Sequence, residues 1–424
     1  MILLHGIASR SDLPLPFWLV LLAAAVVLFV TFYFLFFAWK RSRFEDDDGV
    51  PMPRLTKAID SLPGRVIART LVGAVWILSA VALIFGADRI DNPVVGFIYV
   101  WLWVGLVVFS VFLGKAYKAT NPIRTLLAFR GSAAVAPDGA GSRAPAALAL
   151  AGFLYMELVL PQGITLPALR IAAGLWLAWC IIGFFVRPHW IERADPFEVY
   201  GTTVASLSPW KRKDGVVQRM NPVRNLASWT PPTATYTVAV VLLGGTAFDA
   251  MSNTPRWQRM VQDVSTPAWV LGTIGLAATI ALVTALYALG CKFLDEGEGL
   301  RSTMNRLSPG LVPLIVGYCL AHYGTYLYLE GQRTAIRFND PLGTGQNWFG
   351  FAEAGPNVDL FAFPTFVAWC QVLLIVGGHV LGVVVTHDVA LRRPAGKVMT
   401  RQLPLLLVMV VFTVGGLLLM FGGS

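Results

Sequence analysis

Long runs of apolar residues alternate with short polar segments along the whole chain. Windows of about 20 residues, the length at which a helix crosses the hydrocarbon layer, identify ten such runs. They cover residues 15–38, 66–86, 93–114, 145–160, 166–186, 232–250, 267–290, 308–330, 363–388 and 402–421. This pattern predicts an all-α fold, a polytopic transmembrane helical bundle of about ten spans that forms a single integral membrane domain over residues 1–424.

Composition supports a membrane protein over a soluble globule. The 424 residues are 56% hydrophobic and 13% charged, with a mean hydropathy of +0.64. The first run is too long for the apolar core of a signal peptide and has no basic segment before it beyond Arg10, so we expect a retained span. The four cysteines lie in or beside apolar runs without paired spacing, which indicates buried apolar side chains.

Positive charge is sorted between alternate loops. Of the 33 Lys and Arg residues, 25 fall in the loops after odd-numbered spans, six fall on the opposite side and two fall inside spans. Because basic loops remain in the cytoplasm, both termini are predicted to be extracytoplasmic. The net charge of +9 therefore reflects topology. The lipid bilayer is the predicted partner, and nucleic acid is not.

Two cytoplasmic loops share the pattern Asn-Pro-apolar-Arg, at residues 121–124 and 221–224. The pattern is typical either of a parallel duplication, as in many transporters, or of a turn with a basic anchor at the interface. We favour the anchor. Residues 131–145 are rich in Ala, Gly, Ser and Pro, and they predict a flexible cytoplasmic linker.

Ionisable groups inside apolar runs are costly to bury and are therefore functional candidates. At about 1.5 Å of rise per residue, Asp249, Glu157 and Glu330 lie in the outer leaflet, with His322 about 12 Å inward of Glu330. His322, Tyr326 and Glu330 are spaced four residues apart, so they lie along neighbouring turns of one broad helix face. The sequence thus predicts an outward-opening polar pocket with these five residues as candidate catalytic groups.

Two intramembrane histidines, His322 and His379, are candidate ligands for a divalent metal such as zinc or copper. Their depths differ by about 12 Å, whereas zinc binds each imidazole nitrogen at about 2.1 Å. Joint ligation therefore requires a shifted helix boundary or helix unwinding at Gly377-Gly378. A histidine and carboxylates also suit proton transfer. A structural hydrogen bond between helices remains the alternative for His322.

Other polar groups have simpler interpretations. His387 and Asp388 precede Arg392 and Arg393, which predicts a salt-bridge anchor at the cytoplasmic interface. The chain contains no Gly-rich phosphate loop, no HExxH and no GxSxG.

Six further motifs stand out along the chain: MELVLPQG from Met156, DPFEVYGTTVASLSP from Asp195, GGTAFDAMSNT from Gly244, AHYGTYLYLEGQ from Ala321, NDPLG from Asn339 and GHVLGVVVTHD from Gly378. Together they resemble a family of bacterial polytopic membrane proteins often labelled fenitrothion hydrolase. The resemblance runs from about Asn121 onward, and the motifs are more specific for the family than for an activity. The label implies hydrolysis of an organophosphorus triester in the bacterial cytoplasmic membrane, in a complex with a related membrane subunit.

Three functions remain open on the sequence. In an ester or phosphotriester hydrolase, His322 is the general base or a metal ligand, with Asp249, Glu157 or Glu330 as its partner. In a proton- or metal-ion-conducting transporter, the same groups form a path that His379 and His387 extend inward. In an accessory subunit of a membrane complex, the polar groups serve helix packing alone.

Overall fold

A computed structural model describes residues 12–421 except 14, 46–47, 129–140, 188 and 394–397. Among the described residues, nine helical segments are long and apolar enough to cross a membrane. They are α1 (Phe17–Ala38), α3 (Leu62–Phe85), α4 to α5 (Pro93–Leu113), α9 (Leu166–Val186), α13 (Thr235–Ser252), α15 (Ala268–Lys292), α16 to α17 (Leu300–Arg337), α18 (Pro364–Ala390) and α20 (Leu403–Phe421). A shorter apolar helix, α8 (Ala144–Leu158), occupies the fourth predicted run. Each of the ten predicted apolar runs therefore corresponds to a helical segment among the described residues.

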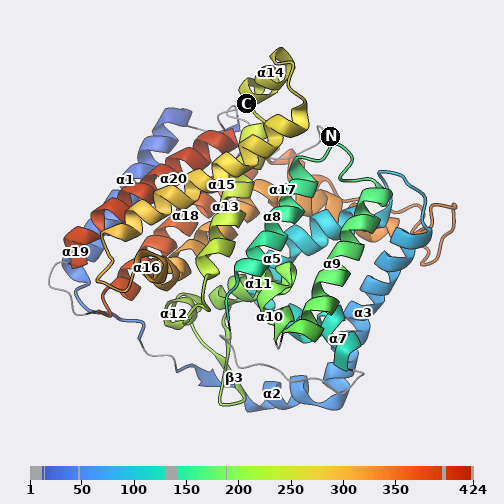
Figure 1. Ribbon diagram of the computed structural model, residues 1–424, viewed down its shortest axis with the longest axis horizontal. Coiled ribbons are helices and arrows are strands. Elements are labelled where there is room, and N and C mark those ends of the chain that lie inside the picture. Colours follow the sequence, from blue (N-terminus) through green and yellow to red (C-terminus); the bar gives the residue numbers. More distant parts are fainter. Residues whose placement is uncertain are drawn as a thin grey trace.

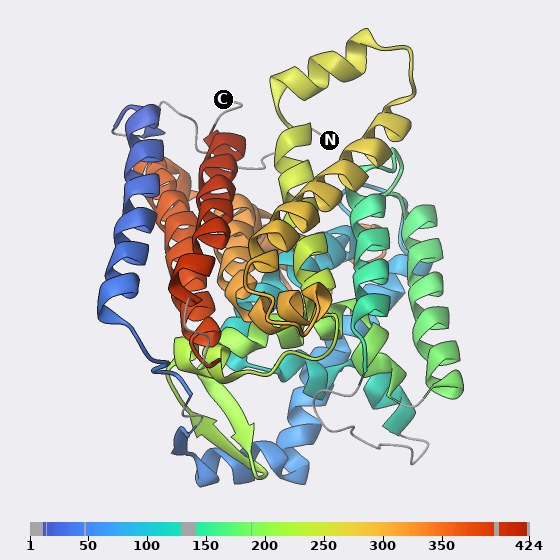
Figure 2. The same ribbon diagram turned by 60° about the vertical axis from the view of Figure 1, so that its left-hand side comes forward.

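The smaller elements gather at two opposite ends of the bundle (Figures 1 and 2). Helix α14 (Pro255–Asp263) projects at one end, while α2 (Pro53–Asp60), α12 (Pro222–Ser228) and the strands lie at the other, here named the basic face. The rings of Phe17 and Phe421 lie 6.1 Å apart, so α1 begins where α20 ends. Both helices therefore have these ends on the side away from the basic face. That this side is extracytoplasmic remains a prediction from the charge pattern.

A small antiparallel sheet at the basic face modifies the all-α prediction. Its strands are β1 (Val50–Pro51), β2 (Trp210–Lys213) and β3 (Val216–Arg219), in the order β1-β3-β2. The β2–β3 turn places Asp214 at φ 50° and Gly215 at φ 79°. Two consecutive positive φ angles are what a two-residue hairpin turn requires, and Asp-Gly is a preferred pair for it. The Asp-Gly pair was thus the sequence signal for the hairpin.

The two Asn-Pro-apolar-Arg segments form the same local structure. Asn121 Oδ1 accepts the backbone N–H of Ile123 at 2.9 Å and starts α7 (Pro122–Ala128), and Asn221 Oδ1 accepts that of Val223 at 2.9 Å and starts α12. An Asn cap followed by proline at the first helical position is a favourable helix start. These contacts fit the anchor interpretation. Residues 131–140 of the predicted linker lie outside the described residues, and α8 begins at Ala144.

Helices α17 (Val312–Arg337) and α18 form the most extensive helix pair and cross through glycines. A Cβ atom added to Gly378 would lie 2.6 Å from the carbonyl oxygen of Pro313, and one added to Gly317 would lie 2.3 Å from that of Leu374. Small residues allow helix backbones to approach closely inside a membrane. This crossing fixes the relative depth of the side chains on the two helices.

We expect Gly378→Ala to destabilise the bundle by about 1–3 kcal/mol, because the added methyl group forces the two helices apart. The neighbouring Gly377 provides a matched control, since a Cβ there meets nothing within 4 Å. Gly377→Ala should be neutral or slightly stabilising, because alanine is the better helix former by about 1 kcal/mol. Unfolding of both variants in detergent micelles measures the difference, and equal effects would contradict the close crossing.

Candidate functional site

Three polar side chains meet in the core between α13 and α17. The Asp249 carboxylate accepts a hydrogen bond from Tyr323 OH at 2.7 Å and lies 2.9 Å from His322 Nε2, with both contacts at Oδ2. Asn253 Nδ2 donates to the other carboxylate oxygen at 3.2 Å. A carboxylate only accepts hydrogen bonds, so His322 Nε2 is protonated and donates the hydrogen bond to Asp249 Oδ2. Asp249, His322 and Tyr323 are here named the polar cluster.

The side chains of the polar cluster are buried. Asp249 is 3% exposed and His322 is 4% exposed. The Tyr318 ring stacks on the imidazole at 5.9 Å, and the Tyr323 ring meets it edge-on at 4.6 Å. The described contacts therefore show a buried imidazole flanked by two aromatic rings of its own helix, and an outward-opening pocket at these residues stays a prediction.

Glycines bring a second carboxylate to the cluster. A Cβ on Gly245 of α13 would lie 2.5 Å from Leu154 Cδ1 of α8, so these two helices pack closely. The following turn of α8 carries Glu157, whose carboxyl group interacts electrostatically with Asp249. Its Oε2 atom is buried and has no hydrogen-bond partner among the residues that the structure describes. Two carboxyl groups from distant parts of the sequence therefore share this part of the core.

Tyr326 and Glu330 lie further along α17, toward the end away from the basic face. Tyr326 interacts electrostatically with Glu157, Glu330 and Asp249, so it lies between the cluster and Glu330. Glu330 forms ion pairs with Arg333 and with Arg337, the latter at 3.3 Å. These ion pairs indicate that Glu330 stabilises the end of the helix. Of the five candidate catalytic residues, the structure gathers Asp249, His322, Glu157 and Tyr326, while Glu330, one turn beyond Tyr326, is paired with two arginines.

The structure does not bring His379 to His322. Gly378 meets α17 near Gly317, and the two helices are antiparallel, which separates the imidazoles by about 9 Å along the helices. His379 Nδ1 instead donates to the carbonyl oxygen of Ile375, one turn earlier in an unbroken α18. Within the described parts of the chain, no group of three or more His, Cys, Asp or Glu residues could hold a metal ion.

His387 and Asp388 join three helix ends at the basic face. His387 Nδ1 lies 2.8 Å from Gln402 Oε1, and its Nε2 lies 3.0 Å from the carbonyl oxygen of Trp39. Asp388 is fully buried and binds the segment after α1 as well as Arg392, at 3.2 Å. These contacts agree with the predicted structural anchor, although they extend beyond one salt bridge.

A buried charge cluster at the basic face escaped the sequence analysis. Arg124 donates two hydrogen bonds to Glu198, at 2.6 and 2.7 Å, and its Nη2 also lies 3.1 Å from Glu192. Asn121 Nδ2 donates to Asp195 Oδ2 at 2.7 Å and to Glu198 Oε2 at 2.8 Å. Burial and the adjacent Glu198 raise the pKa of Asp195 to about 7. Two charged motifs, Asn-Pro-x-Arg and Asp-Pro-x-Glu, could have indicated this cluster, because both are predicted to lie on the cytoplasmic side of the membrane.

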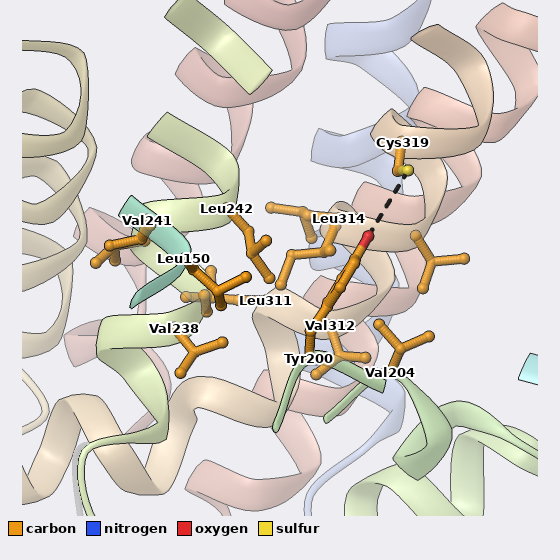
Figure 3. Packing of buried hydrophobic residues seen from close by; sticks show 14 of the residues in the cluster. Leu150, Tyr200, Val204, Val238, Val241, Leu242, Leu311, Val312, Leu314 and Cys319 are labelled. Atoms are coloured by element: carbon orange, nitrogen blue, oxygen red, sulfur yellow. Dashed lines mark hydrogen bonds between the residues drawn. The ribbon is translucent and has the colours of Figure 1, made fainter. Parts of the chain in front are cut away.

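A small cavity lies one helical turn from the polar cluster, toward the basic face. Its walls include Thr246, three residues before Asp249 on α13, and Cys319, four residues before Tyr323 on α17. Tyr200 of α11 (Pro196–Val204) reaches into this layer, and its hydroxyl lies 3.9 Å from Cys319 Sγ (Figure 3). The cavity volume is about 10 Å³, which is room for one water molecule.

The described helices define a multi-pass membrane protein with a buried Asp-His-Tyr cluster. No family model, no curated protein and no solved structure matches the chain.

Proposed function

We propose that this membrane protein transfers protons, with the polar cluster as the group that takes up and releases them. The observation that supports this function best is the Asp249–His322 contact of 2.9 Å inside the helical bundle. Ionisable residues within membrane spans are costly, and they mark proton relays and ion pathways. Imidazole is suited to this role because its unperturbed titration falls near neutral pH.

The hydrogen bonds suggest how the cluster holds a proton. In the neutral imidazole, Nε2–H donates to Asp249 Oδ2, so an additional proton binds at Nδ1 of His322. The resulting imidazolium has the Asp249 carboxylate as its counter-ion, and Tyr323 OH stabilises the same oxygen at 2.7 Å. Proton uptake thus converts one buried negative charge into an ion pair, and release restores the starting state.

Two neighbouring features support proton movement into and out of the cluster. Glu157 provides a second carboxyl group in electrostatic contact with Asp249. The cavity one turn away is lined by Tyr200, Thr246 and Cys319, and also by Trp103, whose buried Nε1 has no hydrogen-bond partner among the described residues. A single bound water needs two to four polar partners, and these side chains provide them. Proton transfer requires no larger opening than this.

Proton flux into liposomes tests the proposal. Purified protein is reconstituted, a potassium gradient with valinomycin sets an inward-driving potential, and a trapped dye reports the internal pH. We expect acidification at least about tenfold faster than in protein-free liposomes. Asp249→Asn should reduce the rate to background, because the amide cannot stabilise an imidazolium by charge.

The matched control is His379→Gln, a buried histidine on the neighbouring helix that binds its own backbone. This variant should retain the wild-type flux. A wild-type rate equal to that of empty liposomes, or an Asp249→Asn rate equal to wild type, rules out the proposed role of the cluster.

Ester hydrolysis is a second candidate, favoured by the carboxylate that orients His322 and by the family resemblance. A carboxylate-bound imidazole acts as a general base in many hydrolases. The cavity of about 10 Å³ beside the cluster cannot hold a phosphotriester, so this function requires helix movement that opens the core. Release of a chromophore from a phosphotriester, abolished in Asp249→Asn and retained in His379→Gln, would support it.

A further inference from the structure

An apolar groove lies on the surface between α1 and α20. These two helices are neighbours at the edge of the bundle (Figure 1). Its volume is about 520 Å³. Phe32 of α1 and Leu406 of α20 form its floor, since both are buried. Phe29, Tyr33 and Phe37 stand at its rim and are each more than half exposed. The groove is thus an indentation in the lipid-facing surface with mainly aromatic walls.

The groove is confined to the half of the bundle nearest the basic face. On α1 it extends from Phe29 to Phe37, just before the helix ends at Ala38, and on the other side it begins at Thr400. Eight residues of helix span about 12 Å, close to the depth of one leaflet at about 15 Å. An acyl chain of a single lipid matches this extent, whereas a partner helix would follow α1 over its whole length.

Basic side chains surround the open end of the groove. Lys40 and Arg41 follow α1 directly and are exposed, and Arg401 precedes α20 with 46% of its side chain exposed. Arg43 stacks over the Trp39 ring at 4.6 Å, the position of an interfacial aromatic residue. Acids also follow this segment: Glu45 is exposed, Asp46 and Asp47 lie outside the described residues, and Asp48 pairs with Lys213 at 2.5 Å. Glu296 lies 3.8 Å from Arg401, and Asp388 is already hydrogen-bonded within the fold.

We infer that this groove is a binding site for a phospholipid with an anionic headgroup. One acyl chain lies on Phe32 and Leu406 between the aromatic rims, and the phosphate headgroup contacts Lys40, Arg41 and Arg401. Basic pockets at the membrane surface select anionic headgroups because Lys and Arg side chains attract the negative charge of the lipid phosphate there. The site is independent of the proton-binding cluster, which lies in the core.

Lipid-dependent thermal unfolding tests the site. Delipidated protein in a neutral detergent is titrated with dioleoyl phosphatidylglycerol or with dioleoyl phosphatidylcholine, which differ only in the headgroup. We expect half-maximal stabilisation at a concentration at least about fivefold lower for the anionic lipid. Native mass spectrometry should show one retained phosphatidylglycerol. In Lys40→Gln/Arg41→Gln the concentrations for the two lipids should become equal, with the response to phosphatidylcholine unchanged.

Arg301→Gln is the control, because Arg301 is exposed on α16 (Leu300–Leu307) and does not line the groove. It should keep the wild-type preference. If the double variant does not fold, Arg401→Gln tests the other wall of the groove. Equal responses of the wild type to both lipids would overturn the inference, as would a preference that survives in the groove variants. A dimer in light scattering that Val30→Trp dissociates would assign the groove to a second copy of the chain.

Discussion

Arg124→Met is expected to destabilise the protein by about 3–5 kcal/mol, the usual cost of removing one partner from a buried ion pair. Arg124 bonds both oxygens of Glu198, which is 1% exposed, and also contacts Glu192. Methionine keeps much of the side-chain volume but no charge. Among the described residues, the Glu198 carboxylate then keeps Asn121 as a side-chain partner, and the Glu192 carboxylate keeps Lys118.

The second Asn-Pro-apolar-Arg segment provides the matched control. Arg224 occupies the same position after Asn221, but it has no ion pair among the residues that the structure describes. Arg224→Met should change stability by no more than about 0.5 kcal/mol, as is usual for substitutions away from buried networks. Titration with SDS in mixed micelles measures both variants. Similar losses in the two would show that the charge cluster is not what makes Arg124 important.

Asp388→Ala is expected to cost about 2–5 kcal/mol and to loosen α1 from the bundle. Asp388 accepts the indole N–H of Trp39 at 3.3 Å, the hydroxyl of Ser42 at 2.9 Å and the backbone N–H of Arg43 at 2.6 Å. Arg392 donates to the same carboxylate at 3.2 Å. Alanine leaves these donors without their buried acceptor, which costs more than the hydrogen bonds themselves contribute.

Limited proteolysis identifies which part of the protein loosens. Trypsin should cleave Asp388→Ala faster than wild type after Lys40 or Arg41, because the segment after α1 is no longer held. Asp263→Ala, at the exposed end of α14, is the control and should leave both stability and cleavage unchanged. If Asp388→Ala unfolds and is cleaved like the wild type, Asp388 is not the residue that attaches α1 to the bundle.

The bundle helices were predictable because a long apolar run in a membrane has only one low-energy backbone structure. The run at 363–388, for example, became α18 at Pro364–Ala390. The short elements were harder to predict, since Trp210–Lys213 is polar and its strand depends on a turn at Asp214-Gly215 and on pairing with a neighbouring strand. The ion pair between Arg124 and Glu198 was not predicted, because the Asn-Pro-x-Arg and Asp-Pro-x-Glu motifs are each typical of a helix N-terminus.

The polar cluster was partly predictable. Helical rise places Asp249 and Glu157 in the outer leaflet and His322 about 12 Å inward of Glu330, so a common site on that side followed from their positions along three runs. Depth does not define which side of a helix faces which neighbour. Tyr323 was therefore not among the candidates, although it donates to Asp249, and Glu330 was included although it pairs with arginines.

By itself, the sequence determined that this chain crosses a membrane many times, because hydrophobic length and loop charge act on each segment separately. It also determined which ionisable groups lie within the spans. Only the tertiary structure decided which of them meet, since the Asp249–His322 contact depends on how α13 and α17 are rotated against each other. Glycines bring each of these helices close to another neighbour, α13 to α8 at Gly245 and α17 to α18 at Gly317, and the sequence alone does not tell which neighbour a glycine faces.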